Sequence, residues 1–77
     1  MTEIPHPGDR IRLLTMQDDP DPIRPGTLGV VTWVTRHGSG TESWHQIGAE
    51  WDNGRTLMLV VPPDRLEIID RTLPQNG

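Results

Sequence analysis

Hydrophobic and polar residues alternate along several short segments of this chain, which is the pattern of half-buried β-strands. In the first segment, Ile11 and Leu13 alternate with arginines, and the second segment is rich in β-branched residues. No window of the chain keeps the 3.6-residue period of a capped helix. The pattern predicts five strands, which span residues 9–14, 27–36, 43–51, 55–61 and 66–69.

The segments between these strands differ in character. Residues 15–26, called the acidic loop below, contain three prolines that exclude a regular strand or helix there. Residues 37–42 form a glycine-rich hairpin loop, and the proline pair in residues 62–65 suits a single 3₁₀ turn before the last strand. We therefore expect one long loop and three short connections.

The tight turn at residues 52–54 sets the register of its hairpin. A three-residue loop pairs Ile47 with Leu59 and puts the large apolar side chains on one face, whereas a two-residue loop turns the leucines outward. We predict the three-residue loop, with Gly54 in the left-handed region closing a bulge.

The second strand carries Val31 and Val34 only three positions apart. Because side chains alternate between faces, both valines reach the core only if this strand has a bulge or a sharp bend. The predicted core is Ile11, Leu13, Leu28, Val31, Val34, Ile47, Ala49, Trp51, Leu57, Leu59, Leu66 and Ile68.

Composition supports one small β-rich domain. The chain has 77 residues, with eight glycines and eight prolines, which suits short strands joined by turns. We expect a domain over residues 8–70, with flexible tails at 1–7 and 71–77. The absence of Cys excludes disulfides, thiolate zinc sites and a Cys nucleophile. Without a membrane-length apolar run or a signal pattern, the expected location is cytoplasmic.

The order of these elements resembles an SH3-like barrel over residues 8–69, and the Gly-Asp opening of the first strand resembles its KOW-type variant. The blocks PGDRIRL, DDPDPI, PGTLGVV, WDNGRTL and DRLEI, in this order, further resemble a small uncharacterised family of bacterial and phage chains. The resemblance implies an all-β, five-stranded SH3-like barrel, with a long acidic loop after strand 1 and a single 3₁₀ turn before the last strand. It implies that the first strand pairs with the last, and a mobile-element origin, but no activity.

Candidate chemistry is sparse. Asp18, Asp19 and Asp21 are interrupted by prolines and lack the later glutamate of a calcium loop, so they indicate a solvated acidic loop. His37 and His45 flank one hairpin loop, and two imidazoles alone make a weak metal site. Nothing in the chain supplies the base, acid and oxyanion hole of a serine triad. We expect no enzyme activity, no metal and no cofactor.

The aromatic surface gives the strongest functional indication. Trp44 begins the third strand on the face opposite Ile47, and Trp33 is expected near it across the hairpin. In peptide-binding SH3 domains, a Trp at this place, an acidic loop and a proline line one groove. The resemblance therefore implies a protein- or peptide-binding site made of Trp44, Trp33, Asp18, Asp19, Asp21 and Pro62.

Two other functions stay open. The KOW resemblance favours a nucleic-acid or nucleoprotein binder acting through Arg10, Arg12, Arg36 and Arg55, although the formal charge of −4 argues against phosphate neutralisation. A third alternative is a homo-oligomer that sequesters a small ligand between subunits. A salt titration separates the first two, because nucleic-acid affinity falls steeply with salt.

Overall fold

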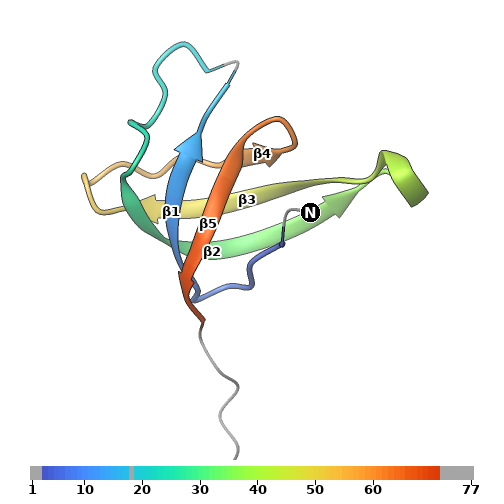
Figure 1. Cartoon of the computed structure of the whole chain (residues 1–77), viewed down its shortest axis with the longest axis horizontal. Helices are drawn as coiled ribbons and strands as arrows, with labels where there is room; N and C mark the ends of the chain where they lie inside the picture. Colours follow the sequence, from blue (N-terminus) through green and yellow to red (C-terminus); the bar gives the residue numbers. More distant parts are fainter. Residues whose placement is uncertain (1–2, 18, 72–77) are drawn as a thin grey trace, which may run out of the picture.

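The computed structural model describes residues 3–17 and 19–71, which form one antiparallel sheet of five strands (Figure 1). The all-β class predicted from the sequence is therefore confirmed. The elements in chain order are β1 (Arg10–Thr15), β2 (Leu28–His37), the 3₁₀ turn η1 (Gly40–Glu42), β3 (Trp44–Trp51), β4 (Leu59–Val61) and β5 (Arg65–Asp70).

The sheet has the order β4-β3-β2-β1-β5. β1 lies between β2 and β5, so the first strand pairs with the last, as predicted. In Figure 1, β1 and β5 cross in front of the long β2–β3 ribbon, and η1 stands at the far tip of that ribbon. The sheet is bent over a small core but is not closed into a barrel, which corrects the closed barrel expected from the sequence.

A single residue, Asp64, explains why the sheet stays open at β4. The backbone N–H of Asp64 donates to the Val60 carbonyl at 2.8 Å, and the Asp64 carboxylate accepts the Val60 N–H at 3.0 Å. These two groups of Val60 are the ones that a further strand would need. The turn after β4 therefore uses the edge that would otherwise continue the sheet.

The 3₁₀ turn lies elsewhere than predicted. The chain turns at Pro62 and Pro63 through two cis peptide bonds, and the next N–H, that of Asp64, bonds to a carbonyl four residues back rather than three. The 3₁₀ turn forms instead at η1, where the Glu42 N–H donates to the Ser39 carbonyl at 3.1 Å.

Both register predictions are confirmed. Ile47 pairs with Leu59, and Gly54 has a φ of 89°, in the left-handed region that the three-residue loop requires. The register of β2 against β3 shifts between Val31 and Trp33, which is the predicted bulge. The fourth strand is shorter than predicted, because residues 55–58 make only an isolated bridge to β3 before β4 begins.

The core lies between the β1–β5 layer and the β2–β3 ribbon. It confirms most of the predicted residues, and its buried members are Ile11, Leu13, Ile23, Val31, Ile47, Ala49, Trp51, Leu59, Val61 and Leu66. Ile23 comes from the acidic loop and was not predicted. Leu28 is half-buried and lies outside this cluster, because in β2 it stands opposite the outward-facing Arg12.

The segment before β1 takes part in this packing. Ile4 packs against the core and Pro5 is buried. The Asp9 carboxylate is buried, accepts the His6 N–H at 2.8 Å and lies 3.7 Å from the Arg71 guanidinium. Residues 4–9 therefore belong to the packed unit. None of the helical turns in the described ranges has the length and apolar character needed to span a membrane.

Candidate functional site

A groove of about 270 Å³ opens between the acidic loop and the chain around β4. Its lining residues come from two segments and are Gln17, Asp19, Leu57, Met58, Val60, Pro63 and Asp64. The residues from the acidic loop are polar, whereas those from positions 57–63 are apolar. The groove therefore has an apolar side and an acidic side.

Two contacts hold the acidic loop beside the groove. Asp64, which is 4% exposed, accepts the Gln17 N–H at 2.7 Å through one carboxylate oxygen and the Val60 N–H through the other. Further along the loop, the Ile23 N–H lies 3.4 Å from the sulfur of Met16, and the Ile23 side chain is fully buried in the core. The loop is thus anchored at its beginning and at its middle, with the acidic residues between the anchors.

Of the two acidic residues of this loop that the structure describes, Asp21 faces solvent, as predicted, and Asp19 is half-buried. The Asp19 carboxylate accepts the N–H of Asp21 at 2.8 Å, and the Asp21 side chain is 86% exposed. Arg55 lies 3.6 Å from the Asp21 carboxylate, in an exposed ion pair that contributes little to stability. Among the groove residues in the described part of the chain, none is basic. Asp18 lies outside the described residues.

Trp44 is held at the start of β3 by a neighbouring histidine. Its indole stacks on the His37 ring, with centroids 4.4 Å apart and an interplanar angle of 22°. The His37 Nε2 is hydrogen-bonded to Gln46 Oε1 at 2.7 Å. Trp44 is half-buried, so one part of its ring stays open to a partner while His37 covers another.

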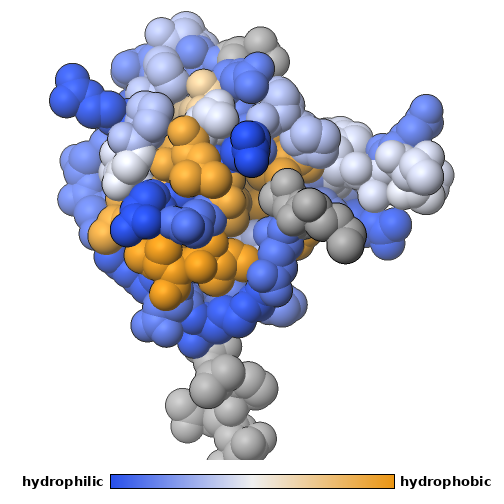
Figure 2. Space-filling model, viewed as in Figure 1, coloured by the Kyte–Doolittle hydropathy of each residue, from blue (hydrophilic) through white to orange (hydrophobic). Residues whose placement is uncertain are grey.

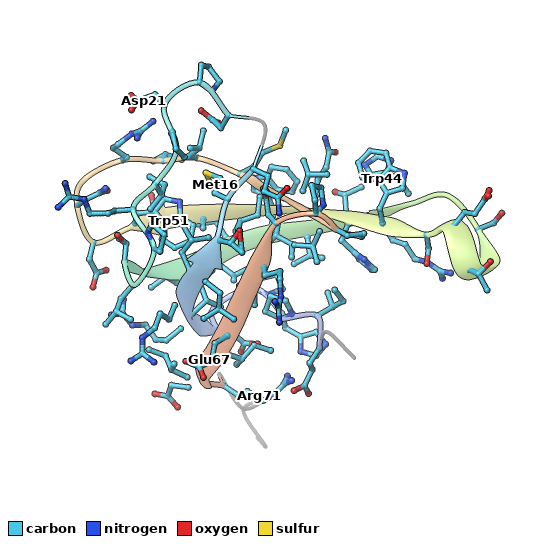
Figure 3. The ribbon with its side chains drawn as sticks, turned by 45° about the horizontal axis from the view of Figure 1, so that its top comes forward. Met16, Asp21, Trp44, Trp51, Glu67 and Arg71 are labelled. Atoms are coloured by element: carbon cyan, nitrogen blue, oxygen red, sulfur yellow. The ribbon has the colours of Figure 1, made fainter. Side chains whose placement is uncertain are left out.

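Pro62 lies at the same end of the sheet as Trp44, because β4 ends at Val61, the partner of His45. Figure 3 shows Trp44 on the same side of the molecule as Met16 and Asp21, opposite the end that holds Glu67 and Arg71. The proline turn therefore lies beside the start of β3, and in this view Trp44 and the acidic loop both lie on the upper side of the molecule, well apart from each other. Pro62 itself is exposed, and it is Pro63 that lines the groove.

Trp33 lies at a distance from Trp44 and does not contact it. It is 42% exposed and lies over Gly48, where an added Cβ would overlap its indole ring. Trp33 pairs with Gly48 and Trp44 with His37, so four residues of β3 separate the two tryptophans, or about 13 Å along the strand. They share the outer face of the hairpin without stacking.

The four arginines of the nucleic-acid alternative are spread over the molecule. Arg12 pairs with Glu67 at 2.6 Å, and Arg10 pairs with Asp52 at 2.9 Å. Figure 2 shows the face of β1 and β5, where hydrophilic side chains lie beside apolar surface. Arg55 is paired with Asp21 on the loop side, and Arg36 lies near the far end of the β2–β3 hairpin.

The Arg10–Asp52 pair shifts the pKa of both its members. The guanidinium donates to both carboxylate oxygens, at 3.0 and 2.9 Å. These hydrogen bonds, more than the charge of Arg10, lower the pKa of Asp52 and raise that of Arg10. The pair joins β1 to the turn after β3.

Histidines and carboxylates do not gather into a metal site in the parts of the chain that the structure describes. His37 and His45 flank the hairpin loop, but they pair with Trp44 and Arg36, respectively, and their side chains leave opposite faces of the sheet.

Sequence reasoning missed most of the groove lining. The predicted hairpin register indicates only that Met58 and Val60 point away from the core, because these even-numbered residues alternate with the buried leucines. Asp64 has no such signal, because its partner Gln17 is 47 positions away in the chain. A Pro-Pro-Asp sequence indicates a turn and says nothing about which loop the carboxylate holds.

Comparisons with known proteins give one match. The model of a family described as a domain of unknown function (DUF4314) matches residues 3–69. No curated protein and no solved structure matches the chain.

Proposed function

We propose that this chain, which belongs to the DUF4314 family of unknown function, is a non-enzymatic interaction module that binds a basic peptide segment of a partner protein. The groove between the acidic loop and β4 takes the segment, and Trp44 and Pro62, which lie at the same end of the sheet, extend the contact surface.

The observation that carries the proposal is the division of the groove into an apolar side and an acidic side. Met58 and Pro63 offer apolar contact, and Asp19 offers a carboxylate whose neighbourhood in the groove holds no basic residue within the described ranges. A peptide with one basic side chain between small apolar ones complements both sides. A half-buried aromatic side chain with part of its ring open to solvent, such as Trp44, is typical of contact surfaces.

The proposal is tested with a positional-scanning library of N-acetylated hexapeptide amides, read by fluorescence polarisation. We expect one position to select Arg or Lys and a neighbouring position to select apolar residues. In Asp19→Asn, affinity for the best hexapeptide should fall by about two- to fivefold, because a charge pair at the protein surface is worth about 1 kcal/mol or less.

The matched control is Glu42→Gln, which removes the same charge from η1 at the far tip of the hairpin. It should leave the affinity unchanged. If Glu42→Gln weakens binding as much as Asp19→Asn, net charge and not the groove is responsible. If the library selects no basic residue, or a DNA duplex binds more tightly than any hexapeptide and with a steep salt dependence, the proposal is wrong.

A further inference from the structure

The hairpin register determines whether the backbone N–H and C=O groups of each residue around β4 point toward β3 or toward the free edge of the sheet. Trp51 donates to the carbonyl of Arg55 at 2.8 Å, and Leu57 donates to the carbonyl of Ala49 at 3.2 Å. The pairing continues at Leu59. Odd-numbered residues therefore bond to β3, and the N–H and C=O groups of the even-numbered residues point to the free edge.

Met58 and Val60 both line the groove, but the backbone N–H and C=O groups that they turn to the free edge differ in their hydrogen bonds. Those of Val60 are both satisfied by Asp64, at 2.8 and 3.0 Å. Those of Met58 make no hydrogen bond within residues 3–17 and 19–71. Met58 is also 42% exposed and lines the groove. An edge with unpaired backbone groups is a template for another strand.

We propose that the partner segment binds in the groove as an extended strand that hydrogen-bonds to the backbone N–H and C=O of Met58. This inference rests on the proposed function and adds the backbone conformation of the ligand. Asp64 limits the added strand to this one pairing position, because it closes the edge at Val60. The acidic loop lies on the other side of the groove.

The same arrangement places the basic residue of the partner. In an extended segment, successive side chains point to opposite sides. A segment paired with Met58 therefore presents alternate side chains toward the acidic loop, where Asp19 lines the groove. Main-chain bonds at Met58 provide affinity, and the carboxylate of Asp19 selects a basic residue at one of the positions that face the acidic loop.

The test compares Met58→Pro with Met58→Ala, using the best hexapeptide of the library above. Proline removes the N–H at position 58 and is tolerated at edge positions whose N–H faces solvent. Alanine keeps the N–H and removes the same long side chain, so it serves as the matched control. We expect Met58→Pro to bind about tenfold more weakly than Met58→Ala, because the peptide carbonyl loses its donor.

Hydrogen exchange of the Met58 amide in the unaltered protein gives a second readout, which does not depend on the folding of a variant. We expect the hexapeptide to slow this exchange by at least about tenfold at saturation. If the hexapeptide binds and depends on Asp19 while the Met58 amide stays unprotected and both variants bind alike, edge pairing is wrong and the proposed function stands. If no hexapeptide binds, both fall together.

Discussion

At the scale of single residues, Asp64 connects the fold to the groove. Its carboxylate accepts one N–H from the acidic loop, at Gln17, and one from β4, at Val60. It is buried and satisfied, so removing it leaves two backbone donors without an acceptor. One side chain thus fixes the distance between the two walls of the groove.

We predict that Asp64→Ala lowers the free energy of unfolding by about 2–4 kcal/mol, because each unsatisfied buried N–H costs about 1–3 kcal/mol. A domain of this size has only about 3–5 kcal/mol in total, so urea unfolding should begin at very low denaturant. Asp70→Ala, at an exposed carboxylate near the end of β5, is the control and should move the urea midpoint little. Equal midpoints for the two variants would show that Asp64 does not hold the loop.

Gly48 gives a second prediction at this scale. A methyl group at position 48 overlaps the indole of Trp33, and Trp33 is an exposed side chain that moves away more easily than backbone does. We expect Gly48→Ala to displace the indole and to destabilise the protein by about 1–3 kcal/mol, the usual cost of overpacking.

A double-mutant cycle checks the cause. In a Trp33→Ala background, Gly48→Ala should cost much less, since the indole is no longer there to collide with. If the cost is the same with and without Trp33, the effect comes from the backbone of β3 and not from this contact.

At the scale of elements, the sequence predicts those features that depend only on pairing within a single hairpin. The bulge near Val31 and the pairing of Ile47 with Leu59 follow from the need to bury one face. The short length of β4 and the shape of the turn after it cannot be predicted from the sequence. Both depend on hydrogen bonds that Asp64 makes across this turn and to the distant acidic loop. Ile23 was missed for a similar reason, since an isolated Ile among prolines has no periodic neighbours.

The Arg10–Asp52 pair carries a pH-dependent contribution at the element scale. Its hydrogen bonds lower the folded-state pKa of Asp52 below the ordinary 3.8. A group with a lowered folded pKa adds stability above its unfolded pKa, and this contribution is lost as the pH falls through the folded value. Because both side chains are exposed, the contribution is small.

We predict that Arg10→Gln returns the Asp52 pKa toward 3.8, measured by NMR titration of the carboxyl carbon. The decline of stability below about pH 4 should become shallower in this variant. Arg65→Gln, at an exposed position of β5, should leave the Asp52 titration unchanged. An unchanged Asp52 pKa in Arg10→Gln would mean that the pair does not persist in solution.

At the scale of the whole molecule, charge and topology act together. The chain has a formal charge of −4, and the acidic loop puts part of it beside the groove. Sequence reasoning identified the acidic loop, the proline turn and Trp44, because each has a local signature in the chain. Three features could not be predicted, because they depend on how the strands pair in the folded sheet. They are the distance between Trp33 and Trp44, the dispersal of the arginines, and the open edge at Met58.

We predict that replacing Asp18, Asp19 and Asp21 by Asn leaves the melting temperature nearly unchanged, since the exposed Asp21 contributes little to stability and Asn at position 19 keeps an oxygen that accepts the Asp21 N–H. The same change should slow association with the basic hexapeptide at low salt, measured by stopped-flow fluorescence. The difference should fade as added salt screens the charges. A triple variant that unfolds would instead assign the loop carboxylates a structural role.

The central claim is that the groove between the acidic loop and β4 is the binding surface. Its most direct test is a ¹H–¹⁵N correlation titration of the labelled protein with the best basic hexapeptide. The amides of Gln17, Asp19, Met58 and Val60 should shift most, and those of Arg12 and its neighbours on the outward face of β1 should stay in place. Largest shifts on the β1–β5 face, with the groove amides unmoved, would contradict the claim.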